Sequence, residues 1–233
     1  MKLSTFLGTA LLSLCAIGAN ALSVATIEHA SIRNDLDSLI ALRSEVDASQ
    51  TPYAAAFLEF RIGVAANAHQ DGKTAKKSLK ASAKILEQSL DNNPDSVATL
   101  TLLSNVYGMT IGVSPMKAMF LGPKSQRMIE RALEMDPSNS QALLVSGISS
   151  YNTPGMFGGS KSDALATLDA AIKAFDADAQ SEWGAAEAWV WRALTLDEMG
   201  RRDDAIADLN TVLEREPDYA WARFILHNMT AQR

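Results

Sequence analysis

The chain has 233 residues, with 21 lysines and arginines against 27 aspartates and glutamates, and therefore a formal net charge of −6. An acidic chain without a block of basic residues argues against a nucleic-acid partner, because neutralising phosphates needs a clustered basic face. The basic pairs Lys76-Lys77 and Arg201-Arg202 are expected to be solvated helix surface.

Residues 1–21 have the pattern of a secretory signal peptide. Lys2 precedes an uncharged, mainly apolar stretch over 3–18, and residues 19–21, Ala-Asn-Ala, form a small-x-small cleavage signal. The apolar stretch is shorter than the roughly 20 residues that span a membrane. We therefore expect an exported, periplasmic protein that is cleaved after residue 21. A lipoprotein is the less favoured alternative, because Cys15 lies in a sequence that resembles a lipid-attachment box.

Cleavage after residue 21 would remove the only cysteine in the sequence. The predicted mature chain then has neither disulfides nor cysteine–metal sites, and its stability must come from burial. It also has no later segment long and apolar enough to span a bilayer.

From residue 22 onward, alanine, leucine, isoleucine and methionine recur at intervals of three and four residues, which is typical of helices. Three proline motifs, at 93–95, 136–138 and 216–218, each close one predicted helix and open the next. Their prolines lie 43 and 80 residues apart. With the helical pattern, this spacing predicts an all-α fold built on an internal repeat of two helices per unit.

Residues 22–93 are predicted to form N-terminal helices with a degenerate helix pair over 52–69 and 73–90. A helix over about 34–46 is expected to cover the open end of that pair. Cover of this kind is needed because each unit of a solenoid buries its apolar face only against a neighbour.

Residues 94–219 are predicted to form three repeat units, and a capping helix is expected over 220–233. The first unit has a helix over 95–109 and a long loop at 110–123. The second unit has its long loop at 152–161. Loops beyond the minimal length often carry function.

The last predicted unit has small and large apolar residues at regular helical positions. They are Trp189, Ala193, Leu196, Gly200, Ala205, Leu209, Val212 and Pro217. These positions match the pattern W-x-x-L-G-x-x-Y…A-x-x-x-F…P, so the unit resembles the tetratricopeptide repeat (TPR) family. The resemblance implies a right-handed superhelical array of antiparallel helix pairs, or α-solenoid. One departure is Arg192, where an apolar residue is expected, so a guanidinium should be free near the inner face.

The stretch TPGMFGGSKS, at 153–162, comes within one residue of a phosphate-binding P-loop. Ser160 stands where the second glycine should be, and a helical pattern precedes the stretch where a P-loop needs a strand. We interpret it as a turn before a helix, with Ser160 and Asp163 forming a capping box. Its P-x-x-F-G-G-x-x-x-x-A-L pattern is similar to that of exported TPR proteins, including the accessory subunit of some tripartite ATP-independent periplasmic transporters.

Other chemistry is not indicated. His29, His69 and His227 are scattered singly, without zinc-ligand spacing, so we predict no metal, no cofactor and no enzymatic activity. An enzyme that uses the long loops is the alternative. Methionines crowd one region, where they are expected to fill irregular space under the loop at 110–123, although flexible thioethers also suit an adaptable binding surface. They are Met109, Met116, Met119, Met128 and Met135.

The predicted function is a periplasmic adaptor that binds a peptide or partner protein on its concave face, which the first helix of each pair lines. Trp191 is the candidate aromatic anchor and Arg192 the candidate carboxylate clamp. The alternative is an oligomeric accessory subunit of a solute transporter with a small-ligand pore. The candidate partner-binding residues are Asn105, Tyr151, Asn152, Glu187, Trp191, Arg192, Asp197 and Glu198.

Overall fold

The computed structural model describes residues 22–46, 52–178 and 181–231. The predicted signal peptide and Cys15 lie outside the described residues. Throughout the described ranges every regular element is a helix and no strand occurs, which confirms the predicted all-α class.

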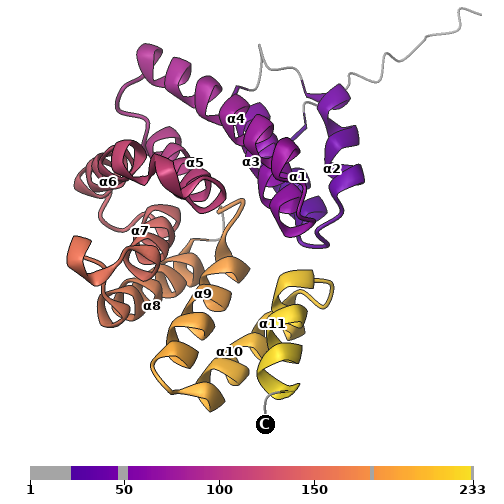
Figure 1. Ribbon diagram of the computed structural model, residues 1–233, viewed down its shortest axis with the longest axis vertical. Helices are drawn as coiled ribbons and strands as arrows, with labels where there is room; N and C mark the ends of the chain where they lie inside the picture. Colours follow the sequence, from indigo (N-terminus) through magenta and orange to yellow (C-terminus); the bar gives the residue numbers. More distant parts are fainter. Residues whose placement is uncertain (1–21, 47–51, 179–180, 232–233) are drawn as a thin grey trace, which may run out of the picture.

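Figure 1 shows the helices in chain order. Three short 3-10 helices, η1 (Leu42–Glu45), η2 (Pro115–Lys117) and η3 (Gly155–Phe157), lie between α-helices. The α-helices are α1 (Val24–Ser31), α2 (Leu36–Ala41), α3 (Pro52–Ala68), α4 (Gly72–Asn92), α5 (Val97–Val113), α6 (Ala118–Met135), α7 (Ser140–Asn152), α8 (Lys161–Ala177), α9 (Ala185–Glu198), α10 (Arg202–Arg215) and α11 (Ala220–Ala231).

The three proline motifs end helices in the same way. In each of the segments 93–96, 136–139 and 216–219, the N–H of the last residue donates to the carbonyl of the first, at 3.0 to 3.3 Å. Ser96 and Asn139 then cap α5 and α7, because their side-chain oxygens accept from backbone N–H groups in the first turn. Each motif therefore lies between the end of one helix and the start of the next, as predicted.

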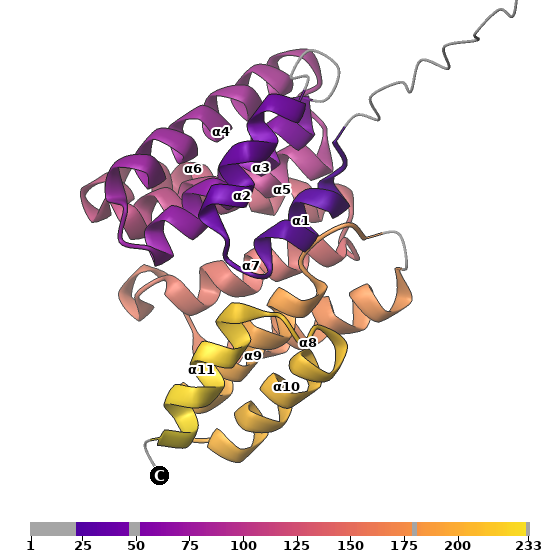
Figure 2. The ribbon, with the colours of Figure 1, turned by 90° about the vertical axis from the view of Figure 1, so that its right-hand side faces the viewer.

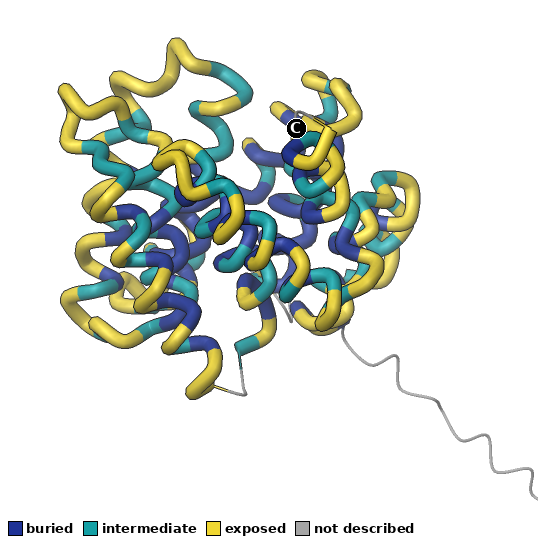
Figure 3. Tube along the Cα trace, turned by 90° about the horizontal axis from the view of Figure 1, so that it is seen from below, coloured by how far each residue is buried: buried dark blue, intermediate teal, exposed yellow. Residues whose placement is uncertain are grey.

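Consecutive helices form the pairs α3–α4, α5–α6, α7–α8 and α9–α10, and each pair packs against the next (Figures 1 and 2). Glycines permit close crossing in two of these pairs. A Cβ on Gly63 would lie 2.8 Å from the Leu79 side chain, and one on Gly147 would lie 2.7 Å from that of Leu168. Buried residues gather where helices face one another, and exposed residues lie on the outward sides (Figure 3).

Gly147→Ala is expected to lower the free energy of unfolding by about 1–3 kcal/mol, because the added methyl group overpacks the crossing of α7 and α8. Gly112→Ala is the matched control, since nothing lies within 4 Å of a Cβ there. Alanine favours a helix over glycine, so the control is expected to be neutral or stabilising. Urea denaturation measures both variants, and equal effects would contradict the close crossing.

The prediction of a long loop at 110–123 is wrong. Helix α5 continues to Val113, and α6 begins at Ala118 after the short η2. Pro123 lies inside α6, where its missing N–H removes one backbone hydrogen bond without ending the helix. There is thus no loop for the methionines to fill, and Met116 and Met119 are 93% and 80% exposed.

The loop predicted at 152–161 is a turn of defined shape between α7 and α8. Gly158 has φ +94°, and a Cβ on Gly159 would lie 1.7 Å from the Thr153 carbonyl oxygen. Ser160 caps α8 by accepting from the Asp163 N–H at 3.2 Å. The P-loop-like sequence at 153–162 therefore forms a glycine turn followed by the first turn of a helix, as interpreted from the sequence.

The N-terminal helices differ from the prediction. The single helix expected over 34–46 is shorter, since α2 ends at Ala41 and η1 follows. Helix α1 was not predicted as a separate element.

The first and last helices of the array meet. The Ala220 N–H, at the start of α11, donates to the Ile32 carbonyl, which follows α1, at 2.8 Å. Ile32 also packs in one apolar cluster with Tyr219 and with residues of α9, α10 and α11. Figure 2 shows α1 and α11 on the same side of the molecule. The curved array therefore closes on itself at its ends.

Candidate partner-binding face

Three aromatic side chains from alternate helices form a row. The Tyr151 ring of α7 lies 5.3 Å from that of Trp191 of α9, which lies 5.4 Å from that of Trp221 of α11. Both contacts are edge-to-face, the arrangement that aromatic quadrupoles favour. Each of the three residues is partly exposed. We call Tyr151, Trp191 and Trp221 the aromatic row.

Charged groups border the aromatic row at Tyr151. The Lys161 ammonium lies 3.3 Å from the centre of the Tyr151 ring and 2.8 Å from a Glu198 oxygen. The Tyr151 hydroxyl donates to the other Glu198 oxygen. The hydrogen bonds from Lys161 and Tyr151 lower the pKa of Glu198, so this carboxylate is ionised at neutral pH. The row therefore combines a flat apolar surface with an internally paired lysine and glutamate.

Glu187 connects the aromatic row to a buried ion cluster. It accepts a hydrogen bond from Trp191 Nε1 at 3.4 Å and pairs with Arg61 of α3 at 3.1 Å. Arg61 also pairs with Glu28 of α1 at 2.7 Å. We call Arg61, Glu28 and Glu187 the buried ion cluster. Because it joins α1, α3 and α9, it ties the two ends of the array together.

Aromatic rings enclose the Arg61 guanidinium. Its carbon lies 5.0 Å from the Phe57 ring centre, 5.4 Å from that of Phe60 and 5.9 Å from that of Trp183. Trp183 in turn donates to the Tyr53 hydroxyl on α3 at 3.2 Å. The connection between α8 and α9 is thereby anchored on α3, across the interior of the array.

Burial raises the pKa of Glu28 above its ordinary value of 4.5, against the attraction of Arg61 and with the help of repulsion from Glu187. The folded state therefore holds this proton more tightly than the unfolded state does. The resulting stabilisation is complete below about pH 4.5 and is lost as the pH rises through the folded pKa.

Glu28→Gln should remove the loss of stability that ionisation of Glu28 causes at higher pH, because the amide does not ionise. The free energy of unfolding of Glu28→Gln minus that of the wild type is expected to grow as the pH rises from 4.5 towards 7. Urea denaturation at several pH values measures this difference. A difference that shrinks with rising pH would contradict the assignment.

The structure gives Arg192 a different role from the predicted carboxylate clamp. Its guanidinium makes two hydrogen bonds to Asp208 of α10, at 2.8 and 2.7 Å, and one to Asp169 of α8 at 2.8 Å. It also stacks 4.3 Å from the Trp189 ring centre. The expectation of a free guanidinium is therefore wrong, because two neighbouring helices supply its carboxylates.

The remaining predicted residues lie apart from the aromatic row or are internally bonded. Asn105 on α5 is only 8% exposed, and within the described residues its Nδ2 has no hydrogen-bond partner. Asn152 donates to the Ile148 carbonyl at 2.9 Å. Asp197 pairs with Arg202 at 2.7 Å. Of the eight candidates, the structure brings together Tyr151, Glu187, Trp191 and Glu198.

Sequence reasoning missed Trp221 and Arg61. Trp221 lies in the capping helix, which was treated as cover and not as part of the inner face. Arg61 is the one cation of α3, a mainly apolar helix whose only other charged residue is Glu59, and a cation among apolar residues needs an anion. That signal was present in the sequence.

The described residues contain no cluster of histidine, cysteine, aspartate and glutamate side chains that could hold a metal ion. Among the described helices, none is both long enough and apolar enough to cross a bilayer.

Comparison with known proteins identifies the repeat. The tetratricopeptide repeat family model matches residues 186–219. One similar solved structure is the HusA haemophore from Porphyromonas gingivalis, at 20% sequence identity and a TM-score of 0.58; the match covers 76% of this chain and 94% of that one. Another is a thermophilic TPR protein from Thermus thermophilus, at 15% identity and a TM-score of 0.55; the match covers 90% of this chain and 100% of that one. Curated proteins give no match. Residues 186–219 therefore form a tetratricopeptide repeat, within a chain that has the fold of TPR proteins.

Proposed function

We propose that the protein is an exported adaptor that binds a segment of a partner protein on the aromatic row. A fold of stacked helix pairs is a scaffold whose inner face presents side chains from several repeats. The observation that carries the proposal is the aromatic row itself, three partly exposed rings supplied by α7, α9 and α11. No catalytic step or cofactor is part of the proposal.

The chemistry of the aromatic row favours a segment with an apolar or aromatic side chain. Tyrosine and tryptophan provide large contact areas at low entropic cost, and they dominate binding energy at interfaces. Lys161 already occupies the place between the Tyr151 ring and Glu198, so the part of the row left for a partner is its ring surface.

A displayed library of random 16-residue peptides tests the proposal. We expect an enriched class whose binding falls at least tenfold on Trp191→Ala and on Trp221→Ala, since central aromatic residues contribute about 2 kcal/mol or more. Phe224→Ala is the matched control, because Phe224 is also an aromatic residue of α11, is 64% exposed and is not one of the stacked rings of the row. Circular dichroism checks that each variant folds. An enriched set that binds all variants equally would contradict the proposal.

Export is a separate part of the proposal. Leu22, the first residue after the predicted cleavage position, is already buried at 8% exposure and belongs to the core. N-terminal sequencing of the protein from its native cells should begin at Leu22, because the small-x-small cleavage signal ends at residue 21. A sequence that begins at Met1 or Lys2 would contradict export by this route.

The alternative, an oligomeric accessory subunit with a small ligand, has one comparison in its favour, since one of the similar folds is a haemophore. Light scattering combined with native mass spectrometry, with and without haemin, distinguishes the two functions. The adaptor proposal predicts no bound haemin, and a stoichiometric haemin complex would favour the alternative.

A further inference from the structure

We propose that the protein has a second interaction surface, on α4 and the tip of the α5–α6 pair, that binds an acidic amphipathic segment of a partner protein. This surface is separate from the aromatic row and does not depend on it. It is made of a row of lysines, a recessed apolar pocket and an exposed apolar lip.

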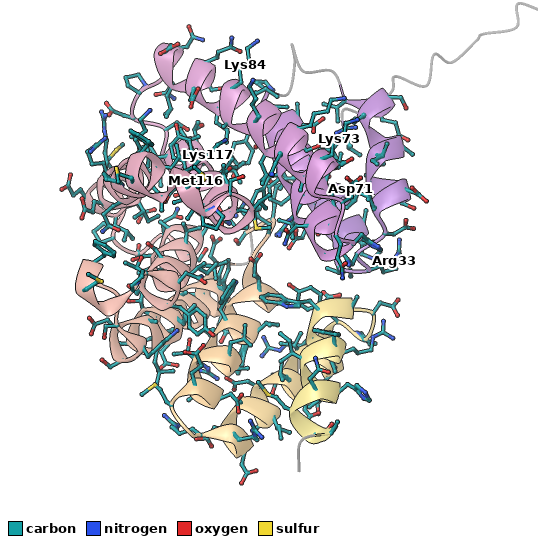
Figure 4. All side chains as sticks on the ribbon, in the orientation of Figure 1. Arg33, Asp71, Lys73, Lys84, Met116 and Lys117 are labelled. Atoms are coloured by element: carbon teal, nitrogen blue, oxygen red, sulfur yellow. The ribbon has the colours of Figure 1, made fainter. Side chains whose placement is uncertain are left out.

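Five exposed lysines lie on one face of α4. Because a helix turns by 100° per residue, positions three, four, seven and eleven residues apart share a face. The row extends for about 16 Å along the helix, at about 1.5 Å per residue. Figure 4 labels its two ends, Lys73 and Lys84. The five residues, which we call the lysine row, are Lys73, Lys76, Lys77, Lys80 and Lys84.

The lysine row is not neutralised by ion pairs within the described part of the chain. None of its five ammonium groups makes an ion pair with a described carboxylate, although Lys73 lies near Asp71. The arginines behave differently, since Arg61 and Arg192 each pair with two carboxylates. Like charges three and four residues apart destabilise a helix. An acidic chain that keeps such a row unpaired has a surface complementary to an acidic partner.

A pocket of about 160 Å³ adjoins the lysine row, between α4, the end of α5 and the start of α6. Lys76 and Lys80 of the row line it, together with Lys117 of η2. Apolar side chains from all three helices form most of its wall: Leu79, Ala83, Val113 and Leu121. The Glu87 carboxylate also lines the pocket, where it accepts a hydrogen bond from the Tyr107 hydroxyl at 2.7 Å, so one internally bonded anion lies among three lysines. The site therefore places ammonium groups beside an apolar recess that one or two apolar side chains would fill.

An exposed apolar lip stands next to the pocket. Met116, Met119 and Phe120 are 93%, 80% and 71% exposed, and they lie within one turn of Lys117 and Leu121, which line the pocket. Figure 4 shows Met116 and Lys117 together at this tip. Flexible methionines adapt to the partner's side chains.

The occupant that fits these features is an acidic amphipathic segment. Its carboxylates would meet the lysine row, and its apolar side chains would enter the pocket and contact the lip. A lipid surface also attracts lysines and exposed apolar residues, but a flat membrane does not fill a recess whose apolar walls lie between cations. The recess therefore favours a protein segment over a membrane.

The same library of displayed 16-residue peptides tests this proposal, when peptides that bind a charge-reversed variant of the lysine row are first removed. Peptides that bind the wild type but not Lys76→Glu/Lys80→Glu/Lys84→Glu should be enriched in aspartate and glutamate at helical spacing. The charge reversal should weaken their binding at least tenfold, and Met116→Ser/Phe120→Ser at least threefold. A matched reversal of three exposed cations elsewhere, Arg33→Glu/Lys173→Glu/Arg223→Glu, should leave binding within twofold.

Three outcomes would overturn the proposal. The first is a failure to enrich acidic peptides. The second is equal loss of binding in the two charge-reversed proteins, which would show attraction by net charge alone. The third is binding to vesicles of phosphatidylglycerol that depends on the lysine row while no peptide is enriched, which would assign the surface to lipid. Trp191→Ala should not affect the acidic peptides, so this proposal and the proposed function fail independently.

Discussion

Arg61→Met is expected to lower the free energy of unfolding by about 3–5 kcal/mol, because it leaves the buried Glu187 and the partly buried Glu28 without their cation. Arg61 also fills the space between Phe57, Phe60 and Trp183, so the loss includes packing as well as charge. Since the three members of the buried ion cluster come from α1, α3 and α9, the variant should loosen the closure of the array.

Urea denaturation compares Arg61→Met with Arg131→Met. Arg131 pairs with Asp95, but both side chains are about half exposed, and an exposed pair contributes about 0–1 kcal/mol. Replacing the two carboxylates as well, in Arg61→Met/Glu28→Gln/Glu187→Gln, should recover part of the stability. A loss below 1 kcal/mol for Arg61→Met would show that the cluster does not hold the array together.

Arg192→Leu is expected to lower the free energy of unfolding by about 2–3 kcal/mol, since hydrogen bonds to charged groups contribute about 1.5–3 kcal/mol. The Asp208 side chain is only 9% exposed and would lose its bidentate partner. Arg192→Leu/Asp208→Leu should regain stability, because the TPR pattern has an apolar residue at position 192 and no buried carboxylate would remain.

The same variant distinguishes a structural role from the predicted clamp. Peptides selected on the aromatic row should bind folded Arg192→Leu as they bind the wild type, because its guanidinium is engaged by Asp208 and Asp169. Loss of binding at unchanged stability would restore Arg192 as a partner-binding residue.

The sequence was sufficient where local spacing decides the structure. The proline motifs end helices through hydrogen bonds within four residues, and Ser160 caps α8 three residues away. Ala193, Leu209 and Val212 are buried at the positions the TPR pattern gives them. These features depend on neighbours within one or two helices, so periodicity predicts them.

Contacts between distant segments were not predictable in this way. Arg61 and Glu187 are 126 residues apart, and the link from Ala220 to Ile32 joins opposite ends of the array. The loop predicted at 110–123 is wrong for a different reason: α5 extends to Val113, and α6 begins at Ala118 and continues through Pro123. The lysine row follows from helical spacing alone, but its position beside the pocket depends on how α4 packs against α5 and α6.

The four tryptophans provide the most direct test of the proposed binding face, because each indole N–H gives one signal in a ¹⁵N–¹H spectrum. Trp191 and Trp221 belong to the aromatic row, whereas Trp183 contacts Phe57 and Trp189 contacts Arg192. On titration with a peptide selected for the row, the signals of Trp191 and Trp221 should shift while those of Trp183 and Trp189 stay in place. Shifts confined to Trp183 and Trp189 would contradict the account.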